Sequence, residues 1–169
     1  MTPTPRVNSR AKGRGFEQKI ATDLRAWLGP AWTVARNQTD RQGGQVKGSA
    51  GEFMIEHPTL VCPFVIECKA HESFDYGQLM DPKLPGPFRS FWAQAQRQAD
   101  KSGNGRPLLI LKRNRGPVLA CFDWLDTRLL FSDPTPLPQV RLVVDRGTVV
   151  VLPWASVLAY AAPAWRGPV

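Results

Sequence analysis

An apolar run that ends in two charged side chains constrains the fold of this chain more than any other feature. Phe64-Val65-Ile66 is followed directly by Glu67-Cys68-Lys69. Because side chains on a β-strand alternate between its two faces, we expect Ile66 and Cys68 to point into the core while the carboxylate and the ammonium group emerge side by side. The sequence therefore predicts a strand that carries both charges on one face.

A second carboxylate, Glu52, lies fifteen residues upstream in Gly51-Glu52-Phe53. If residues 51–57 form a strand and the chain turns at Pro58-Thr59, Glu52 lies across from Glu67 in a hairpin. Mg²⁺ prefers oxygen ligands and usually takes one or two protein carboxylates, with water and substrate phosphate completing its octahedron. The two glutamates are therefore a candidate metal site. Glu56, on the same strand face as Glu52, is the alternative first ligand.

An E-x-K triplet is also ordinary on the solvent face of an edge strand, so the metal-site interpretation needs support from elsewhere in the chain. Residues 15–28 predict an amphipathic helix that has one apolar stripe and is closed by Gly29-Pro30. Glu17 falls on that stripe. Because an unpaired charge on a buried face is costly, we expect Glu17 to have a metal site or a basic group as its partner.

These motifs, in this order, resemble the PD-(D/E)xK nuclease superfamily, and within it the archaeal-type Holliday junction resolvases and their phage-borne relatives. The resemblance covers roughly residues 12 to 123, judged by motif order and spacing. The chain departs from the pattern at Glu52, where most relatives carry aspartate. The matching elements are Lys12-Gly13-x-x-Phe16-Glu17, Gly51-Glu52-Phe53, Glu67-Cys68-Lys69-Ala70, Phe91-Trp92-x-Gln94 and the strand from Pro107 to Lys112.

The resemblance implies an α/β restriction-endonuclease-like core, with a central mixed β-sheet flanked by helices. It implies a homodimeric, Mg²⁺-dependent endonuclease that cuts branched DNA such as a four-way (Holliday) junction in recombination and repair, with Mn²⁺ as a substitute metal. Two other readings stay open: a repair, restriction or single-strand-processing nuclease of the same fold, and a DNA-binding module that has lost catalysis.

The resemblance also assigns roles to individual residues. Glu52, Glu67 and the carbonyl of Cys68 would hold the metal, while Lys69 would orient and polarise the attacking water. Glu17 would support the metal or its water from the first helix. Gln94 would hydrogen-bond near the active-site lysine or a DNA phosphate.

The net charge of +8 favours an anionic partner. Nucleic acid is the commonest such partner for a small basic protein, although a ribosomal or merely basic surface carries the same charge. Basic residues gather in the N-terminal segment, in the glycine-rich stretch 36–51 and at a predicted hairpin tip. The candidate DNA-binding residues are Arg10, Lys12, Arg14, Arg36, Arg41, Lys47, Lys112 and Arg113.

The length of 169 residues and the 43% apolar content suit one domain. We expect a disordered basic arm at 1–11, a single nuclease domain at 12–162 and a tail at 163–169. Within the domain, the patterns predict a helix at 88–101, hairpins at 107–123 and 140–152, and a short helix at 154–161. Residues 71–87 are expected to form an irregular flap or a dimer element.

No membrane span or signal peptide is apparent in the sequence, so a cytoplasmic location is expected, in the host if the chain is phage-encoded. Three cysteines without a C-x-x-C motif are expected to be reduced core thiols.

Overall fold

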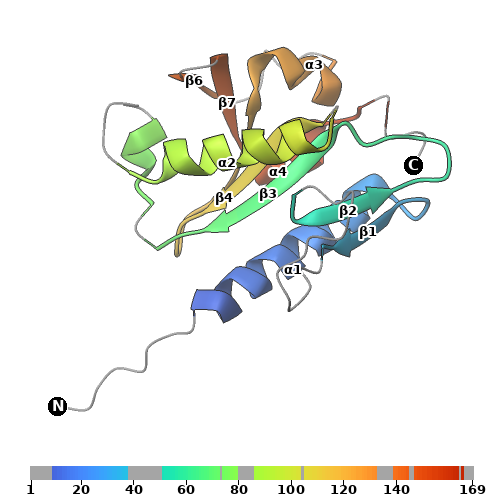
Figure 1. Cartoon of the computed structure of the whole chain (residues 1–169), viewed down its shortest axis with the longest axis horizontal. Coiled ribbons are helices and arrows are strands. Elements are labelled where there is room, and N and C mark those ends of the chain that lie inside the picture. The colour runs from blue at the N-terminus through green and yellow to red at the C-terminus, as the bar shows by residue number, and fades with distance from the viewer. Residues whose placement is uncertain are drawn as a thin grey trace.

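A computed structural model describes residues 9–37, 51–72, 74–79, 86–103, 105–132, 139–144, 147–163 and 165. Helices cover both faces of one central sheet (Figure 1). The elements in order are α1 (Ser9–Leu28), β1 (Thr33–Arg36), β2 (Phe53–Glu56), β3 (Phe64–Ala70), η1 (Tyr76–Leu79), α2 (Phe88–Lys101), β4 (Arg106–Lys112), β5 (Val118–Asp123), η2 (Trp124–Asp126), α3 (Thr127–Leu130), β6 (Val140–Val144), β7 (Gly147–Pro153) and α4 (Trp154–Tyr160).

The main sheet has five strands in the order β3-β4-β5-β7-β6. β3 and β4 are parallel and are joined through α2, whereas the remaining neighbours are antiparallel. β1 and β2 form a separate antiparallel pair. That pair meets the edge of β3 where the Glu52 N–H donates to the Ile66 carbonyl at 2.8 Å. The predicted α/β class, with a mixed sheet flanked by helices, is confirmed.

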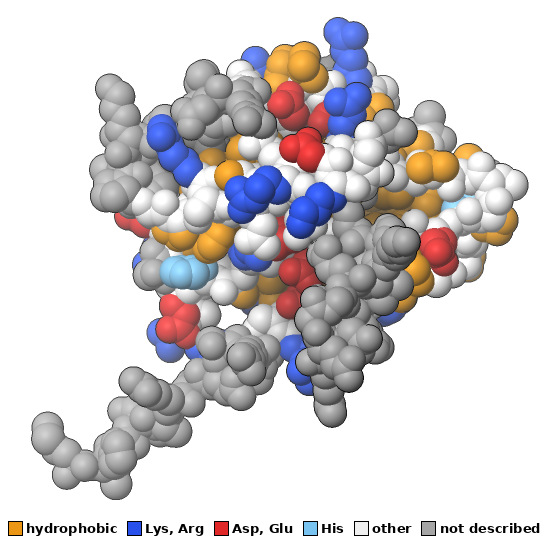
Figure 2. Space-filling model, in the orientation of Figure 1, with side chains coloured by type: hydrophobic (Ala, Val, Ile, Leu, Met, Phe, Trp, Pro, Cys, Tyr) orange, Lys and Arg blue, Asp and Glu red, His pale blue; other side chains and the backbone are white. Residues whose placement is uncertain are grey.

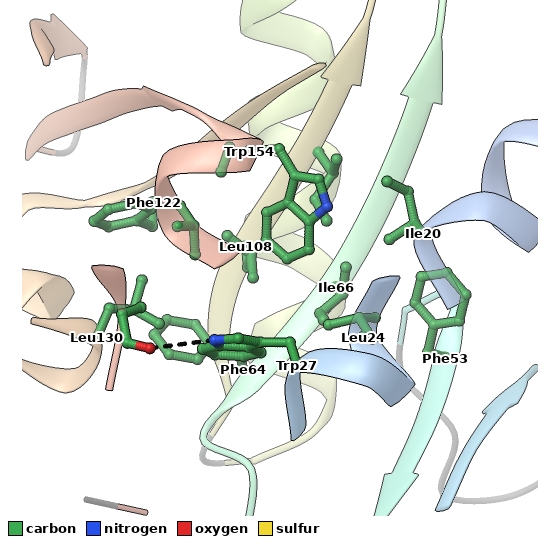
Figure 3. Close-up of a cluster of buried hydrophobic side chains, with 14 of the residues drawn as sticks. Ile20, Leu24, Trp27, Phe53, Phe64, Ile66, Leu108, Phe122, Leu130 and Trp154 are labelled. Atoms are coloured by element: carbon green, nitrogen blue, oxygen red, sulfur yellow. Dashed lines mark hydrogen bonds between the residues drawn. The ribbon is translucent and has the colours of Figure 1, made fainter. Parts of the chain in front are cut away.

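Both faces of the main sheet are covered, which explains the near-continuous apolar runs in its central strands. On one face, Ile66 and Leu108 pack against α1 and against Trp154 of α4 (Figure 3). On the other face, Leu109 and Leu111 pack against α2 through its buried side chains. These side chains are Phe88, Trp92, Ala95 and Ala99, spaced three and four residues apart.

The hairpin expected between β2 and β3 is wrong. β2 pairs instead with β1, in a register that places Arg36 opposite Phe53. After β2 the chain leaves the strand conformation, and the His57 imidazole accepts from the backbone N–H groups of Thr59 and Leu60, both at 3.1 Å. This local turn, followed by Pro63, prevents a continuous ladder between the two strands.

The first helix begins at Ser9, six residues before the predicted start at Gly15. Gly13 and Gly15 each lower helix propensity by about 1 kcal/mol relative to alanine, which is why the sequence pattern favoured the later start. The packing of Phe16 and the following apolar stripe outweighs that cost. Residues 9–11 of the expected arm are therefore helical, and residues 1–8 lie outside the described part of the chain.

The last described residue, Trp165, is half-buried and packs against the core. Its ring lies 5.8 Å from those of both Trp27 and Trp32, with edge-to-face geometry. Its indole N–H donates to the Leu129 carbonyl at 2.7 Å.

Candidate active site

Glu67 is a buried carboxylate in the middle of β3, with only 2% of its surface exposed. Lys69, two residues later on the same strand face, donates to its Oε1. Gln94 of α2 donates to the same oxygen at 2.7 Å. The expected side-by-side placement of Glu67 and Lys69 is present, and α2 brings Gln94 onto the same carboxylate. A buried charge of this kind is tolerated because it is hydrogen-bonded and paired.

The backbone around Glu52 is fixed from both sides. Its N–H donates to the Ile66 carbonyl of β3 at 2.8 Å, and its own carbonyl accepts from the Asn37 N–H at 2.9 Å. The Asn37 side-chain amide donates to the Gly51 carbonyl at 2.8 Å. Asn37 therefore clamps the segment that delivers Glu52 to the edge of β3.

Gly51 is required for this close approach. It has a φ of 75°, in the left-handed region. A Cβ at this position would stand 2.7 Å from the Ile66 carbonyl oxygen. Only glycine satisfies both conditions without moving the chain. The glycine before the first carboxylate is thus part of the geometry of the site.

The carboxyl group of Glu52 lies in a negative, partly buried environment. Burial raises its pKa, and the nearby Glu67 and Glu17 carboxylates raise it further, against the lowering effects of Lys69 and Arg36, to about 7. The three carboxylates, drawn from α1, β3 and the start of β2, are therefore electrostatically coupled. Their negative charge exceeds what the two neighbouring cations neutralise, which is an environment that favours binding of a further cation.

Glu17, on the inner side of α1, forms an ion pair with Arg36 of β1. The expectation that this acid needs a partner is thereby met by a basic group. Arg36 was predicted as a DNA-binding residue, and that role stays a prediction beside its ion pair with Glu17. In Figure 2, acidic side chains lie in the space between α1 and α2, with Lys and Arg side chains over α2.

The residues present fit a hard divalent cation. Glu52 and Glu67 are two electrostatically coupled carboxylates, and Mg²⁺ usually takes one or two carboxylates from a protein. No group of three or more His, Cys, Asp or Glu side chains in the described ranges has the arrangement of a metal site. The Cys68 thiol is buried, and burial together with the nearby carboxylates holds its pKa well above the ordinary value. The thiol is therefore protonated at neutral pH in the metal-free protein.

Glu56, the alternative first ligand, lies at the far end of β2 opposite Thr33 and is exposed. The structure brings Glu52, and not Glu56, to β3. Among the other DNA-binding candidates, Arg14 and Arg113 are exposed. Lys12 and Lys112 line one pocket beside α1. Arg41, Lys47 and the side chain of Arg10 lie outside the described residues.

The model of a family described as "Phage putative PDDEXK endonuclease" matches residues 8–140. The chain belongs to this family. The matched range contains the three carboxylates of the acidic cluster, Glu17, Glu52 and Glu67, together with Lys69 and Gln94. Membership of this endonuclease family indicates a nuclease with DNA as its substrate. PD-(D/E)xK nucleases usually use divalent metals, in agreement with the carboxylate pair. No curated protein and no solved structure matches the chain.

Two contacts of this candidate site were not predicted from the sequence: the hydrogen bonds of Asn37 to residues 51 and 52, and the ion pair of Arg36 with Glu17. Asn37 is separated from Gly51 by fourteen residues, and no local pattern links the two positions. In the described parts of the chain, no helix combines the length and apolar character that a membrane crossing requires.

Proposed function

We propose that this chain is a metal-dependent endonuclease that acts as a homodimer on branched DNA, with Holliday junction resolution as its reaction. The observation that carries the proposal is the coupling of Glu52 and Glu67 beside the Lys69 ammonium group. The order of the motifs along the chain supports a branched substrate. A homodimer supplies the two-fold axis that symmetric cutting of a four-way junction requires.

Glu52 and Glu67, with the Cys68 carbonyl, would hold Mg²⁺, and Mn²⁺ would substitute for it. When bound, such an ion lowers the pKa of a water molecule and stabilises negative charge on the phosphate. Lys69 would orient the attacking water and place positive charge beside the phosphate. The ion pair between Lys69 and Glu67 holds the ammonium group in place.

Gln94 and Glu17 act around this centre. Gln94 donates to Glu67 and so fixes the carboxylate from α2. Glu17 adds negative charge to the cation site. Arg36 forms an ion pair with Glu17, which fixes the Glu17 side chain and partly offsets its repulsion of the other two carboxylates. Lys12, Arg14, Arg41, Lys47, Lys112 and Arg113 contact the DNA backbone.

The test incubates the protein with labelled four-way, forked and linear DNA of matched sequence in the presence of Mg²⁺. We expect the four-way junction to be cut far faster than the linear duplex. Lys69→Ala and Glu67→Gln are expected to abolish cleavage and retain DNA binding. Glu56→Gln is the matched control, because Glu56 is exposed and lies at the far end of β2.

Calorimetric titration with Mn²⁺ gives a readout that does not depend on cleavage. Binding should occur in the wild-type protein and in Glu56→Gln, and disappear in Glu67→Gln. Cleavage that survives Glu67→Gln or Lys69→Ala at the wild-type rate would contradict the assignment of the site. Equal rates on junction and duplex would contradict only the branched-DNA specificity.

A further inference from the structure

A second, basic pocket lies next to the candidate active site. It has a volume of about 240 Å³ and opens where β3 and β4 end, beside α1. The paired residues Ala70 and Lys112, at the ends of the two strands, line this pocket. Ala70 directly follows Lys69, but it lies with Lys112 on the opposite face of the sheet, the face that α1 covers. Its full lining is Lys12, Gly15, Phe16, Lys19, Ala70, Lys112 and Asn114.

The composition of this lining suits an anion. Three of its seven residues are lysines and none is acidic. Lysine binds phosphate as a point charge, and the Asn114 side-chain amide adds a neutral donor. A Cβ built on Gly15 would meet nothing within 4 Å, so the helix presents open space to the pocket at this turn. The Lys112 ammonium group lies 6.0 Å from the centre of the Phe16 ring, which positions it over α1.

One exposed carboxylate already uses two of these donors. Glu72, two residues after the end of β3, forms an ion pair with Lys12. Hydrogen bonds from Lys12 and from Asn114 lower the pKa of Glu72, so it carries its charge at neutral pH. The side chain of Glu72 is 67% exposed. A surface ion pair of this exposure is weak, so another anion can replace the carboxylate.

We infer that this pocket binds a DNA backbone phosphate other than the one that is cut, and that Glu72 holds Lys12 and Asn114 until that phosphate replaces it. The inference rests on the proposed function, since it takes the DNA from that proposal. Ala70 and Lys112 lie on the face of the sheet that α1 covers, whereas Lys69 lies on the opposite face of β3, so the phosphate in the pocket and the phosphate beside Lys69 are held on two sides of β3. Such a contact positions the strand without reading its sequence.

The experiment measures binding of labelled four-way DNA by fluorescence anisotropy over a series of salt concentrations, in EDTA so that no strand is cut. Lys112→Gln should weaken binding several-fold and reduce the slope of log K against log salt by about 1. Glu72→Gln should tighten binding, because it removes the competing charge. Lys101→Gln is the matched control, since Lys101 is exposed at the end of α2, outside the pocket lining.

Lys112 also packs over Phe16, so Lys112→Arg and a thermal melt of each variant separate loss of charge from loss of folding. Wild-type binding in Lys112→Arg together with weak binding in folded Lys112→Gln supports the inference. An unchanged affinity and salt slope in Lys112→Gln would overturn it. The inference would also be overturned if inorganic phosphate raised the melting temperature of the wild type but not of Lys112→Gln, while both proteins bound DNA with equal affinity. The pocket would then bind free phosphate and not the DNA backbone.

These outcomes are independent of the cleavage assay. A protein that cuts DNA but shows no effect of Lys112→Gln loses only the phosphate pocket. A protein that binds DNA with the expected salt slopes but never cuts loses only the nuclease proposal.

Discussion

At the scale of single residues, Gly51 governs the placement of the first carboxylate. We expect Gly51→Ala to destabilise the protein by about 1–3 kcal/mol, because alanine is strained at positive φ and its Cβ would meet the Ile66 carbonyl. Mn²⁺ affinity should fall as well, since Glu52 is displaced from β3. Thermal unfolding and calorimetric titration would measure both effects.

Gly103→Ala is the matched control for this change. Gly103 has a φ of 84°, close to that of Gly51, but a Cβ there would meet nothing within 4 Å. It should therefore show the backbone strain alone and keep full metal affinity. Equal losses of metal affinity in the two variants would mean that Gly51 acts through general stability and not through the placement of Glu52.

The raised pKa of Glu52 predicts two pH dependences at the same scale. The folded-state pKa of about 7 exceeds the ordinary value of 4.5, so this group's contribution to the stability of the metal-free protein is present below 4.5 and is lost as pH rises through about 7. Metal binding requires the deprotonated Glu52 carboxylate, so Mn²⁺ affinity should rise by up to about tenfold per pH unit below 7 and level off above it.

Thermal melts across this pH range would measure the trend in stability, and calorimetric titrations would measure the trend in Mn²⁺ affinity, each repeated with Glu52→Gln. A Glu52→Gln variant that kept the wild-type pH profile would contradict the assignment.

At the scale of secondary-structure elements, α2 controls the site through its distance from β3. Ala95, beside Gln94 in sequence, is fully buried between the helix and the sheet. We expect Ala95→Leu to cost about 1–3 kcal/mol through overpacking. It should also weaken Mn²⁺ binding, because the helix moves outward and Gln94 loses its 2.7 Å bond to Glu67. Ala155→Leu, at an exposed position of α4, should change neither quantity. Destabilisation with unchanged metal affinity would show that Gln94 does not hold Glu67.

The sequence predicted elements well where local pattern and packing agree. The bounds 88–101 of α2 match the prediction at both ends, since the helix has a regular apolar stripe and is bordered by Pro87 and Gly103. The spacing of E-x-K likewise predicted the contact between Glu67 and Lys69. Both features depend on residues that are neighbours in the chain or on one face of one element.

The errors and omissions concern partners that are distant in sequence. Strand β2 has four residues, and the choice between β1 and β3 as its partner depends on a turn around His57 that no strand pattern reveals. The segment 124–130 was not predicted to be helical, because its two helical pieces are too short to show a periodic pattern of apolar residues. The first piece begins where the Asp123 side chain accepts a hydrogen bond from the Leu125 N–H. The ion pair between Arg36 and Glu17 was not predicted, because the two residues lie on different elements.

At the scale of the whole molecule, a protein with a net charge of +8 concentrates carboxylates at one point. The overall field attracts DNA over long range, whereas the acidic cluster repels phosphate unless a divalent cation is bound. We therefore expect the metal to increase the affinity for DNA in the wild type and to have little effect in Glu67→Gln. This coupling links the local site to the charge of the molecule.

The proposed homodimer predicts how a mixed dimer behaves on a four-way junction. A dimer with one wild-type subunit and one Glu67→Gln subunit has a single working site, so it should nick one strand and fail to release paired duplex products. Two different affinity tags isolate this species, and strands labelled separately distinguish nicked from resolved junctions. A mixed dimer of wild type with Lys101→Gln is the control and should resolve junctions fully. Resolution at the wild-type rate by the Glu67→Gln mixed dimer would mean that one subunit makes both cuts, and the two-site arrangement would be wrong.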